Sequence, residues 1–420
     1  MRQSIRAGSF DHPVGPATCV QYAINFTVIM LPMFTRRLAL PPRSFLLLGP
    51  RGTGKTTWLR QHLPRAQWYN LLLDRELLRL MRSPGAFRQE IEALPKGAWV
   101  VIDEVQKLPS LLNEVHDALS AAPRRWRFAL TGSSARRLRR EDVNLLGGRV
   151  VMRQMLPLTR AEMGGEPAPA ELLRFGGLPL VRAEPSVAGR IDLLEAYVET
   201  YLTQEIRAEA LVRSLETFTR FLEVAALANG QVTNTASLAR DAAVARPTVQ
   251  GYFEVLTDTL LGAWLPAWRP RAKVKEVAHP KFYLFDCGVA RALGRRLREP
   301  LDAAERGALL ETLVFQELRA QIAYGDASGE LAYYRTPSGT EIDFVWTRGK
   351  TVVGIEVKAS ERWRPEFSRA LKDLHGSGVI RRAFGVYLGD RPLRDGAVHV
   401  LPLATFLREL AGGRVLAAAR

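Results

Sequence analysis

Three glycines, a lysine and three threonines stand close together between residues 49 and 57, which read Gly-Pro-Arg-Gly-Thr-Gly-Lys-Thr-Thr. This spacing fits the pattern G-x-x-x-x-G-K-[ST], in which a glycine-rich backbone points successive N–H groups at phosphate oxygens. Lys55 would reach the β- and γ-phosphates, and the Thr56 hydroxyl would bind Mg²⁺. The predicted nucleotide-binding residues of this loop are Gly49, Pro50, Arg51, Gly52, Thr53, Gly54, Lys55, Thr56 and Thr57. We therefore expect a site for ATP and Mg²⁺ here.

Two adjacent carboxylates, Asp103 and Glu104, follow the apolar run at residues 99–102. A buried parallel strand presents the residues at its carboxyl end to the ligand crevice, so both side chains would face the nucleotide. Asp103 would hold Mg²⁺ through water, and Glu104 would orient and polarise the attacking water. An acidic pair after a strand is common by itself, but together with the glycine-rich loop it favours hydrolysis over nucleotide binding alone.

Two further elements could complete an ATP site. Thr131 and Ser133 follow an apolar run, where many ATPases place a polar sensor of the γ-phosphate, although a simple Ser/Gly turn explains them equally well. Arg149 follows two glycines and could act as an arginine finger, in cis or from a neighbouring subunit. A finger donated across an interface would require a homo-oligomer, and a solvated surface role for Arg149 stays open.

A second group of chemistry-bearing residues lies near the carboxyl terminus. Glu356 and Lys358 are two positions apart on a predicted strand, so they share one face, and Asp343 at the end of the neighbouring strand can meet them. With the Val357 carbonyl, and with Glu311 from the preceding helix, the two carboxylates would bind Mg²⁺, while Lys358 would stabilise the developing charge. A solvated hairpin with scattered charges is the alternative. We predict a metal-dependent phosphodiester cleavage site.

The composition sets limits on the partners. The chain has 420 residues, 59 Lys and Arg against 43 Asp and Glu, and a net charge of +16. This length predicts several globular domains, and the charge favours a polyanion, with DNA the first expectation, an anionic membrane surface the second and an arginine-rich background the alternative. The two cysteines, Cys19 and Cys287, are too few for a disulfide framework, which fits a cytoplasmic protein. Residues 23–34 are too short to span a bilayer, for which about 20 apolar residues are needed, so no membrane association is expected.

The pattern of apolar segments indicates an α/β multidomain chain. Residues 44–48, 67–73, 98–102, 127–130 and 149–155 read as strands that alternate with helices, which predicts the parallel sheet of a P-loop NTPase. The strands expected near the carboxyl terminus are residues 331–335, 341–346 and 351–358.

The middle of the chain, residues 186–261, reads as mostly helical and includes a helix-turn-helix pattern at residues 234–256. Ala239, Val244, Val249 and Leu256 are expected to point inward, and Pro247 suits a first helical turn. The basic segment 268–281 resembles a wing, with Arg269, Arg271, Lys273, Lys275 and Lys281. The second helix exposes Arg246, Thr248 and Gln250 but also two acids, so a DNA-binding unit and a purely structural winged helix both stay open.

Several motifs in one order resemble a known family. The segments GPRGTGKTT, WVVIDEVQ, LTGSSARRL and LLGGR look like AAA+ class ATPases, and FGGLPLV, YLFDCGVARAL, GTEIDFVW and GIEVKAS are similar to the domain of formerly unknown function 4143 that accompanies them. The resemblance covers about residues 33–400. It implies a winged helix followed by a fold like the PD-(D/E)xK restriction endonucleases, and it carries over to Lys55, Thr56, Asp103 and Glu104 and to Asp343, Glu356 and Lys358. Ile342 departs from the nuclease motif, which has proline there.

These observations together predict a cytoplasmic, Mg²⁺-dependent ATPase coupled to DNA binding and to phosphodiester cleavage, in DNA processing or defence. A nucleotide-gated DNA-binding switch with an inactive nuclease scaffold and a protein-remodelling ATPase are the alternatives. The expected parts are a loosely ordered extension at 1–32, with Met33 as an alternative start, the ATPase domain at 33–160, a linker or lid at 161–190, the winged helix at 191–295, and a restriction-endonuclease-like α/β domain at 296–420.

Overall fold

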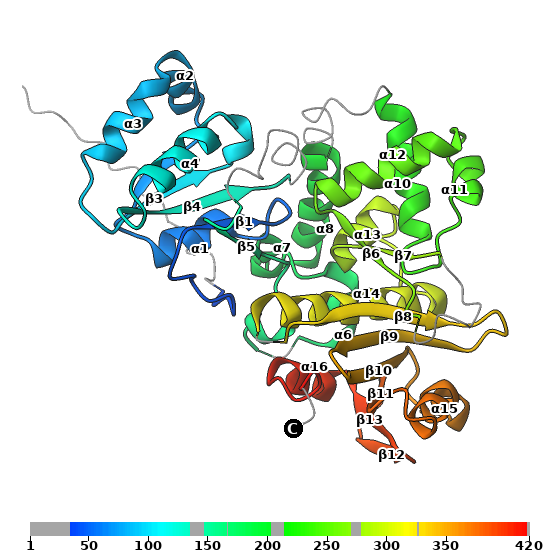
Figure 1. Ribbon diagram of the computed structural model, residues 1–420. Coiled ribbons are helices and arrows are strands. Elements are labelled where there is room, and N and C mark those ends of the chain that lie inside the picture. The colour runs from blue at the N-terminus through cyan, green and yellow to red at the C-terminus, as the bar shows by residue number, and fades with distance from the viewer. Residues whose placement is uncertain are drawn as a thin grey trace, which may run out of the picture. The chain divides into compact units, whose positions relative to one another are not determined.

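A computed structural model describes residues 34–134, 147–165, 167–202, 214–269, 279–325 and 327–417 (Figure 1). The chain divides into residues 1–33 and 34–420, and every described residue belongs to the second unit. The predicted amino-terminal extension, with Cys19 and Met33, lies outside the described residues.

The amino-terminal part is built on a five-stranded parallel sheet with the strand order β2-β3-β4-β1-β5. Its strands are short apolar runs: β1 Phe45–Leu48, β2 Gln67–Asn70, β3 Ala98–Asp103, β4 Trp126–Gly132 and β5 Val151–Gln154. The helices between them are α1 Lys55–His62, α2 Asp74–Arg82, α3 Pro84–Glu92 and α4 Leu111–Ala121, and the short helix η1 Val105–Lys107 follows β3. The second predicted strand is three residues shorter than expected, because Leu71 to Leu73 turn into α2.

Helices cover both faces of this sheet, as the nearly continuous apolar strands require. One core holds Val100, Ile102 and Phe128 against α2, α3 and α4. The other holds Phe45 and Val101 against Trp58 and Leu59 of α1. The parallel sheet of a P-loop NTPase is therefore confirmed, with the carboxyl ends of β1, β3 and β4 at one edge.

The middle of the chain is helical. Its helices are η3 Arg160–Glu162, α6 Pro169–Phe175, α7 Pro179–Ala183, α8 Val187–Ala196, the π-helical η4 Tyr197–Leu202, α10 Leu215–Leu227, α11 Thr235–Asp241, α12 Arg246–Asp258 and α13 Cys287–Leu293. The Asn234 side chain caps α11, and Pro247 lies in the first turn of α12. Val249 and Leu256 are buried and Val244 is half-buried, so α11 and α12 form the predicted helix-turn-helix.

The wing differs from the prediction. The paired strands after the helix-turn-helix are β6 Gly262–Leu265 and β7 Lys281–Leu284, so the predicted segment 268–281 mostly connects them. Arg269 is exposed, and Arg271, Lys273 and Lys275 lie outside the described residues. Lys281 is not a surface residue of the wing, because it begins β7 and is only 4% exposed.

The carboxy-terminal part has a six-stranded mixed sheet with the order β12-β13-β11-β10-β9-β8. Its strands are β8 Glu330–Arg335, β9 Glu341–Arg348, β10 Thr351–Lys358, β11 Arg382–Tyr387, β12 Leu393–Asp395 and β13 Val398–Pro402. The helices are α14 Ala303–Tyr324, η5 Pro365–Ser368, α15 Arg369–Gly376 and α16 Leu403–Ala411. Strand β10 is buried nearly throughout, because Ile355 and Val357 belong to the core that contains α14 while the opposite face packs against α15.

One hydrophobic core joins the winged helix to this sheet. It includes Phe253 of α12, Phe282 of β7, Phe315 of α14 and Phe344 of β9. The backbone also connects the two parts, since the Trp268 N–H donates to the Tyr333 carbonyl and the Tyr333 N–H donates to the Pro266 carbonyl. The observed architecture is thus the α/β multidomain arrangement expected from the sequence. Within the described residues, no helix is both long and apolar enough to cross a bilayer.

Candidate active sites

The glycine-rich loop connects β1 to α1 at the carboxyl edge of the parallel sheet. Gly52 and Gly54 have φ angles of 81° and 88°, in the left-handed region that favours glycine. Gly49 is needed for space, because a Cβ atom there would lie 2.3 Å from the Met155 carbonyl oxygen. The loop therefore has the sharp turn and close approach that a phosphate cradle requires.

The lysine and the threonine of the G-x-x-x-x-G-K-[ST] pattern lie at the start of the helix that follows the loop. Lys55 begins α1, and its Nζ donates hydrogen bonds to the carbonyl oxygens of Gly49 at 2.7 Å and Pro50 at 3.1 Å. The ammonium group is thus held over the loop, from which it can reach phosphate oxygens. Thr56 lies in the first turn of α1, and Thr57 beside it is exposed.

Asp103 lies between two threonines at the end of β3. One carboxylate oxygen accepts a hydrogen bond of 2.9 Å from the Thr56 hydroxyl, and the other accepts one of 2.6 Å from the Thr131 hydroxyl. Burial raises the pKa of Asp103, although both hydrogen bonds act to lower it. A divalent cation beside Thr56 and Asp103 would favour the ionised carboxylate, so the donor set fits Mg²⁺.

Glu104 is held by its neighbours in an unusual backbone conformation, with a φ angle of 61°. Its N–H donates to the Thr131 hydroxyl at 2.9 Å. Its carboxylate accepts hydrogen bonds from Gln106 and from Ser133, the latter at 3.2 Å. Non-glycine residues in this region of φ and ψ are strained and often lie at functional sites, which agrees with the predicted catalytic role.

Residues outside the motif also contact the loop. The Tyr197 hydroxyl donates to the Arg51 carbonyl at 3.0 Å. Arg36 donates to the Thr53 carbonyl at 2.8 Å, and the same guanidinium pairs with the buried Glu162 at 3.1 Å. Sequence analysis missed Arg36 and Tyr197, because neither belongs to a spacing pattern around the loop.

Arg149 is exposed and makes no hydrogen bond or ion pair to another described residue. Gly148 before it has a φ angle of 76°. The structure therefore does not bring Arg149 to the glycine-rich loop through any described contact, and its role as a finger stays a prediction.

The predicted carboxy-terminal residues do lie together. Lys358 forms an ion pair with Glu356 and lies 3.8 Å from Asp343 Oδ2. That Asp343 oxygen also accepts the Val357 N–H at 2.8 Å. Glu311 of α14 joins them from the side and accepts a hydrogen bond of 3.0 Å from the Tyr283 hydroxyl.

Two further residues belong to the same cluster: Lys281, which the sequence predicted as part of the wing, and Glu341, which it did not single out. Lys281 Nζ lies 2.7 Å from Glu341, 3.5 Å from Glu311 and 3.9 Å from Asp343. A lysine that begins the apolar run Phe282–Phe285 was the available signal, because such a position is usually buried and a buried lysine needs carboxylate partners.

Burial changes the charge balance of this cluster. Burial and the charge of Asp343 raise the pKa of Glu311 to about 7, and the same two causes raise the pKa of Glu356 well above its ordinary value. Burial alone would lower the pKa of Lys281, but the charges of Glu311, Asp343 and Glu341 outweigh it and raise the pKa. Within the described ranges, no group of three or more His, Cys, Asp or Glu side chains is arranged to hold a metal ion.

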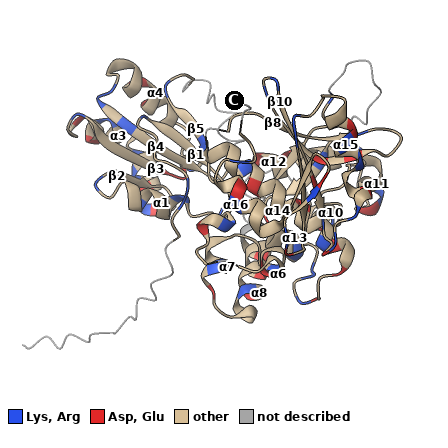
Figure 2. Cartoon of the chain, turned by 90° about the horizontal axis from the view of Figure 1, so that it is seen from below, with Lys and Arg blue, Asp and Glu red and all other residues tan. Residues whose placement is uncertain are grey.

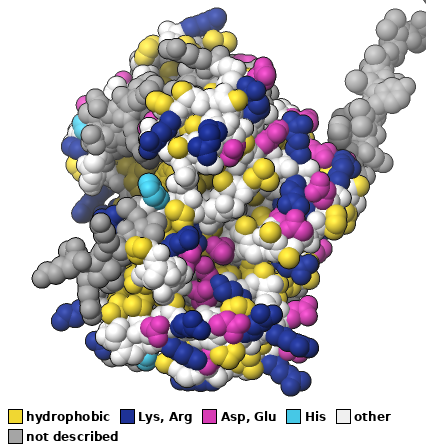
Figure 3. All heavy atoms as spheres, turned by 90° about the vertical axis from the view of Figure 1, so that its right-hand side faces the viewer, with side chains coloured by type: hydrophobic (Ala, Val, Ile, Leu, Met, Phe, Trp, Pro, Cys, Tyr) yellow, Lys and Arg dark blue, Asp and Glu magenta, His cyan; other side chains and the backbone are white. Residues whose placement is uncertain are grey.

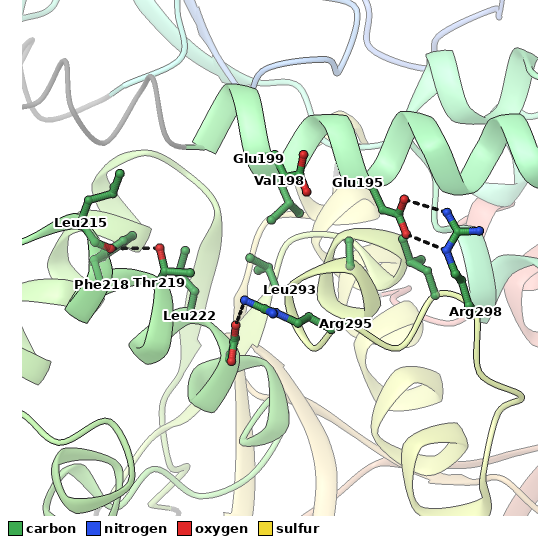
Figure 4. A pocket seen from close by; sticks show the side chains of 13 residues that line it. Glu195, Val198, Glu199, Leu215, Phe218, Thr219, Leu222, Leu293, Arg295 and Arg298 are labelled. Carbon is green, nitrogen blue, oxygen red and sulfur yellow. Dashed lines mark hydrogen bonds and ion pairs between the residues drawn. The ribbon is translucent and has the colours of Figure 1, made fainter.

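Two grooves lie outside these clusters. A groove of about 590 Å³ runs between the start of α11 and the turn from β8 to β9, and its lining includes Arg246, His279 and Arg335. A second groove, of about 510 Å³, is shown in Figure 4 between the helices α8, α10 and α13. Its apolar lining includes Phe218 and Leu222, and ion pairs of Arg298 with Glu195 and of Arg295 with Glu223 flank it. None of the predicted site residues lines the second groove.

Three protein-family models match successive parts of the chain. An AAA domain matches residues 42–164, and a domain of unknown function, DUF4143, matches residues 306–406. The amino-terminal part of the chain is thus similar to AAA domains, and the carboxy-terminal part is similar to DUF4143 domains. Between the two, residues 168–300 match another domain of unknown function, DUF8612. The AAA and DUF4143 parts of the resemblance are thereby confirmed, whereas the motifs FGGLPLV and YLFDCGVARAL lie in the segment that matches DUF8612.

Known proteins resemble the chain along most of its length. The uncharacterized protein Rv2008c from Mycobacterium tuberculosis and the uncharacterized protein Mb2031c from Mycobacterium bovis are each 28% identical over 360 residues, which is 84% of this chain and 79% of theirs. Among solved structures, a RuvB variant from Thermotoga maritima has 18% identity and a TM-score of 0.28, and covers 53% of this chain and 82% of its own. The ORC2 protein from Aeropyrum pernix in its ADP form has 15% identity and a TM-score of 0.30, and covers 64% and 88%.

The P-loop fold and the AAA domain support nucleotide binding and ATPase activity.

Proposed function

We propose that the chain is a Mg²⁺-dependent ATP hydrolase that couples its nucleotide cycle to DNA binding. The arrangement of Asp103 carries the first half of the proposal, since its two oxygens are held by Thr56 and Thr131 at the end of β3. In this role Lys55 binds the β- and γ-phosphates, and Thr56 and Asp103 hold Mg²⁺. Glu104 orients the attacking water.

The contacts of Arg36 and Tyr197 with the glycine-rich loop would transmit a nucleotide-dependent movement of the loop to other parts of the chain. Arg36 links the Thr53 carbonyl to Tyr324 of α14, with which it forms a hydrogen bond of 3.0 Å. Tyr197 links the Arg51 carbonyl to η4. Any shift of the loop on binding phosphate must therefore strain contacts to the middle and carboxy-terminal parts, and we propose that this is the basis of coupling.

DNA is the proposed partner because of the groove beside the winged helix. The described residues that line it include Arg246, Arg335 and His279, and none of these lining residues is a carboxylate. Cationic side chains at such a groove suit a phosphate backbone. Elsewhere, Lys and Arg are interspersed with Asp and Glu along the helices and over the face seen in Figure 3, so the net charge of +16 alone does not mark a binding surface (Figure 2).

Fluorescence anisotropy with labelled duplex DNA tests this proposal. The affinity should fall linearly on a logarithmic salt scale, with a slope set by the number of phosphates neutralised, and it should change between ATP and ADP. Binding that is absent or insensitive to salt would contradict the DNA proposal and would favour the protein-remodelling alternative, for which no nucleic acid is needed.

Further parts of the sequence predictions remain proposals. Arg149 would complete a neighbouring ATP site in a homo-oligomer, and the cytoplasm would supply ATP and Mg²⁺. The domain boundaries predicted from the sequence also remain proposals. Phosphodiester cleavage by Asp343, Glu356 and Lys358, with Glu311 as an additional ligand, would require a divalent cation among these side chains, and the ion pairs of Asp343 with Lys281 and Lys358 oppose it.

A further inference from the structure

Lys281 occupies the centre of the carboxylate cluster in the DUF4143 domain. Its ammonium group lies within 4 Å of three carboxylates: Glu341 at 2.7 Å, Glu311 at 3.5 Å and Asp343 at 3.9 Å. The centroid of the Tyr333 ring lies 5.4 Å from the same nitrogen, and only 4% of Lys281 is exposed. The Lys281 ammonium group therefore supplies a permanent positive charge at the centre of this carboxylate cluster.

The fold fixes Lys281 in this place. The three residues that follow it in β7, Phe282, Tyr283 and Leu284, are at most 2% exposed and belong to the core shared with the DUF4143 domain. The Tyr283 ring stacks on Phe315 of α14, with 4.5 Å between the ring centroids. Lys281 cannot leave the carboxylates unless this core is disrupted.

Both carboxylate oxygens of Asp343 have partners among the described residues. Its Oδ2 atom accepts the Val357 N–H at 2.8 Å and lies 3.8 Å from Lys358, while Oδ1 lies 3.9 Å from Lys281. Lys358 is paired with Glu356 as well. The ammonium groups of Lys281 and Lys358 therefore flank the Asp343 carboxylate, which the sequence predicts as a metal ligand.

A divalent cation does not fit this arrangement. Mg²⁺ takes about six oxygen ligands at roughly 2.1 Å, and it would have to displace or approach both lysines. Glu356 Oε2 is buried without a hydrogen-bond partner, and one such oxygen is far from a complete set of ligands. The carboxylates are instead arranged around ammonium groups, and the described residues contain no group arranged to hold a metal.

We infer that Lys281 takes the place of the divalent cation, so that the DUF4143 domain of this chain is a metal-independent, non-cleaving module. The centre then serves to join β7 of the winged helix to α14 and β9 through ion pairs of the buried Lys281 with the partly buried Glu311 and Glu341. The inference rests on neither ATP hydrolysis nor DNA binding, and it can fail while both hold.

Binding of Mn²⁺ to the full chain, followed by electron paramagnetic resonance without nucleotide, tests the inference. The measurement uses an Asp103→Asn background, so that the ATP site does not contribute. The background protein should bind no Mn²⁺ that depends on Asp343. Adding Lys281→Met should create about one Mn²⁺ site per chain, and a further Asp343→Asn change should abolish it. Lys281→Arg keeps the charge and should bind none, and Lys350→Met, at an exposed lysine, controls for the loss of a positive charge.

Mn²⁺ binding by the background protein that disappears with Asp343→Asn would overturn the inference. So would a folded Lys281→Met protein that gains no site. If circular dichroism shows that Lys281→Met does not fold, the test is the comparison of Mn²⁺ binding by the Asp103→Asn protein with and without the Asp343→Asn change. Mn²⁺-dependent nicking of plasmid DNA by the otherwise unchanged chain that is lost with Asp343→Ala would overturn it equally.

Discussion

Replacing Thr131 with valine should slow ATP hydrolysis strongly while it leaves the fold intact. Valine has nearly the shape of threonine but lacks the hydroxyl, which donates to Asp103 at 2.6 Å and accepts from the Glu104 N–H at 2.9 Å. The sequence suggested Thr131 as a contact to the γ-phosphate, whereas the structure places its hydroxyl between the two carboxylate residues. The change therefore acts on both Asp103, the proposed metal ligand, and Glu104, the proposed water-orienting residue.

The magnitude follows from the lost hydrogen bond to a charged group. Such a bond contributes about 1.5–3 kcal/mol, and Thr131 is fully buried, so water cannot replace it. If this free energy is lost in the transition state, kcat falls by roughly 10- to 150-fold. The KM for ATP should change much less, because the glycine-rich loop and Lys55 are untouched.

Steady-state release of phosphate from Mg²⁺-ATP measures the effect. Thr131→Ser is the matched control, since it keeps the hydroxyl and should hydrolyse ATP within a few-fold of the unchanged protein. Equal rates for Thr131→Val and Thr131→Ser would refute the assignment of this hydroxyl to Asp103 and Glu104.

The remaining predictions concern stability and DNA. Burial raises the folded-state pKa of Glu317 from 4.5 to about 7, so the carboxyl costs stability as pH rises through this interval, by roughly 3 kcal/mol once the pH is above 7. Glu317→Gln should therefore increase the free energy of unfolding in urea at pH 8 and leave it unchanged near pH 4. Glu330→Gln, at an exposed glutamate, is the control. An equal effect of Glu317→Gln at both pH values would contradict the burial argument. For DNA, serine at Arg246 and Arg335 of the groove should flatten the salt dependence measured by anisotropy and weaken all sequences equally. An unchanged slope, together with a flattened slope after serine substitution at four basic positions of segment 268–281, would move the contact to that segment. The four positions are Arg269, Arg271, Lys273 and Lys275.

The sequence predicted most of the ATP site, because its chemistry is local. The glycine-rich loop needs a strand before it and a helix after it, and the structure has β1 and α1 there. Asp103 and Glu104 follow a buried strand, and parallel strands present their carboxyl ends at one edge. What the sequence could not give is the direction of the Thr131 hydroxyl, or the contacts of Arg36 and Tyr197 with the loop, since these depend on tertiary packing.

In the carboxy-terminal cluster, too, the local placement of residues could be predicted from the sequence, whereas the long-range contacts could not. Alternation along β10 correctly placed Glu356 beside Lys358, and the strand pairing brought Asp343 to them. The sequence assigned Lys281 to the surface of the wing because basic residues precede it in the chain. Its place among Glu311, Glu341 and Asp343 results from the core that β7 shares with α14, and residue spacing carries no signal of such a long-range contact.

The central claim is ATP hydrolysis at the glycine-rich loop, and parallel measurement of nucleotide binding and phosphate release tests it most directly. Lys55→Ala should weaken ATP binding and abolish turnover, because it removes the phosphate-binding ammonium. Glu104→Gln should bind ATP like the unchanged protein and release almost no phosphate, because only the water-orienting group is lost. Phosphate release by Glu104→Gln at the rate of the unchanged protein would contradict the account.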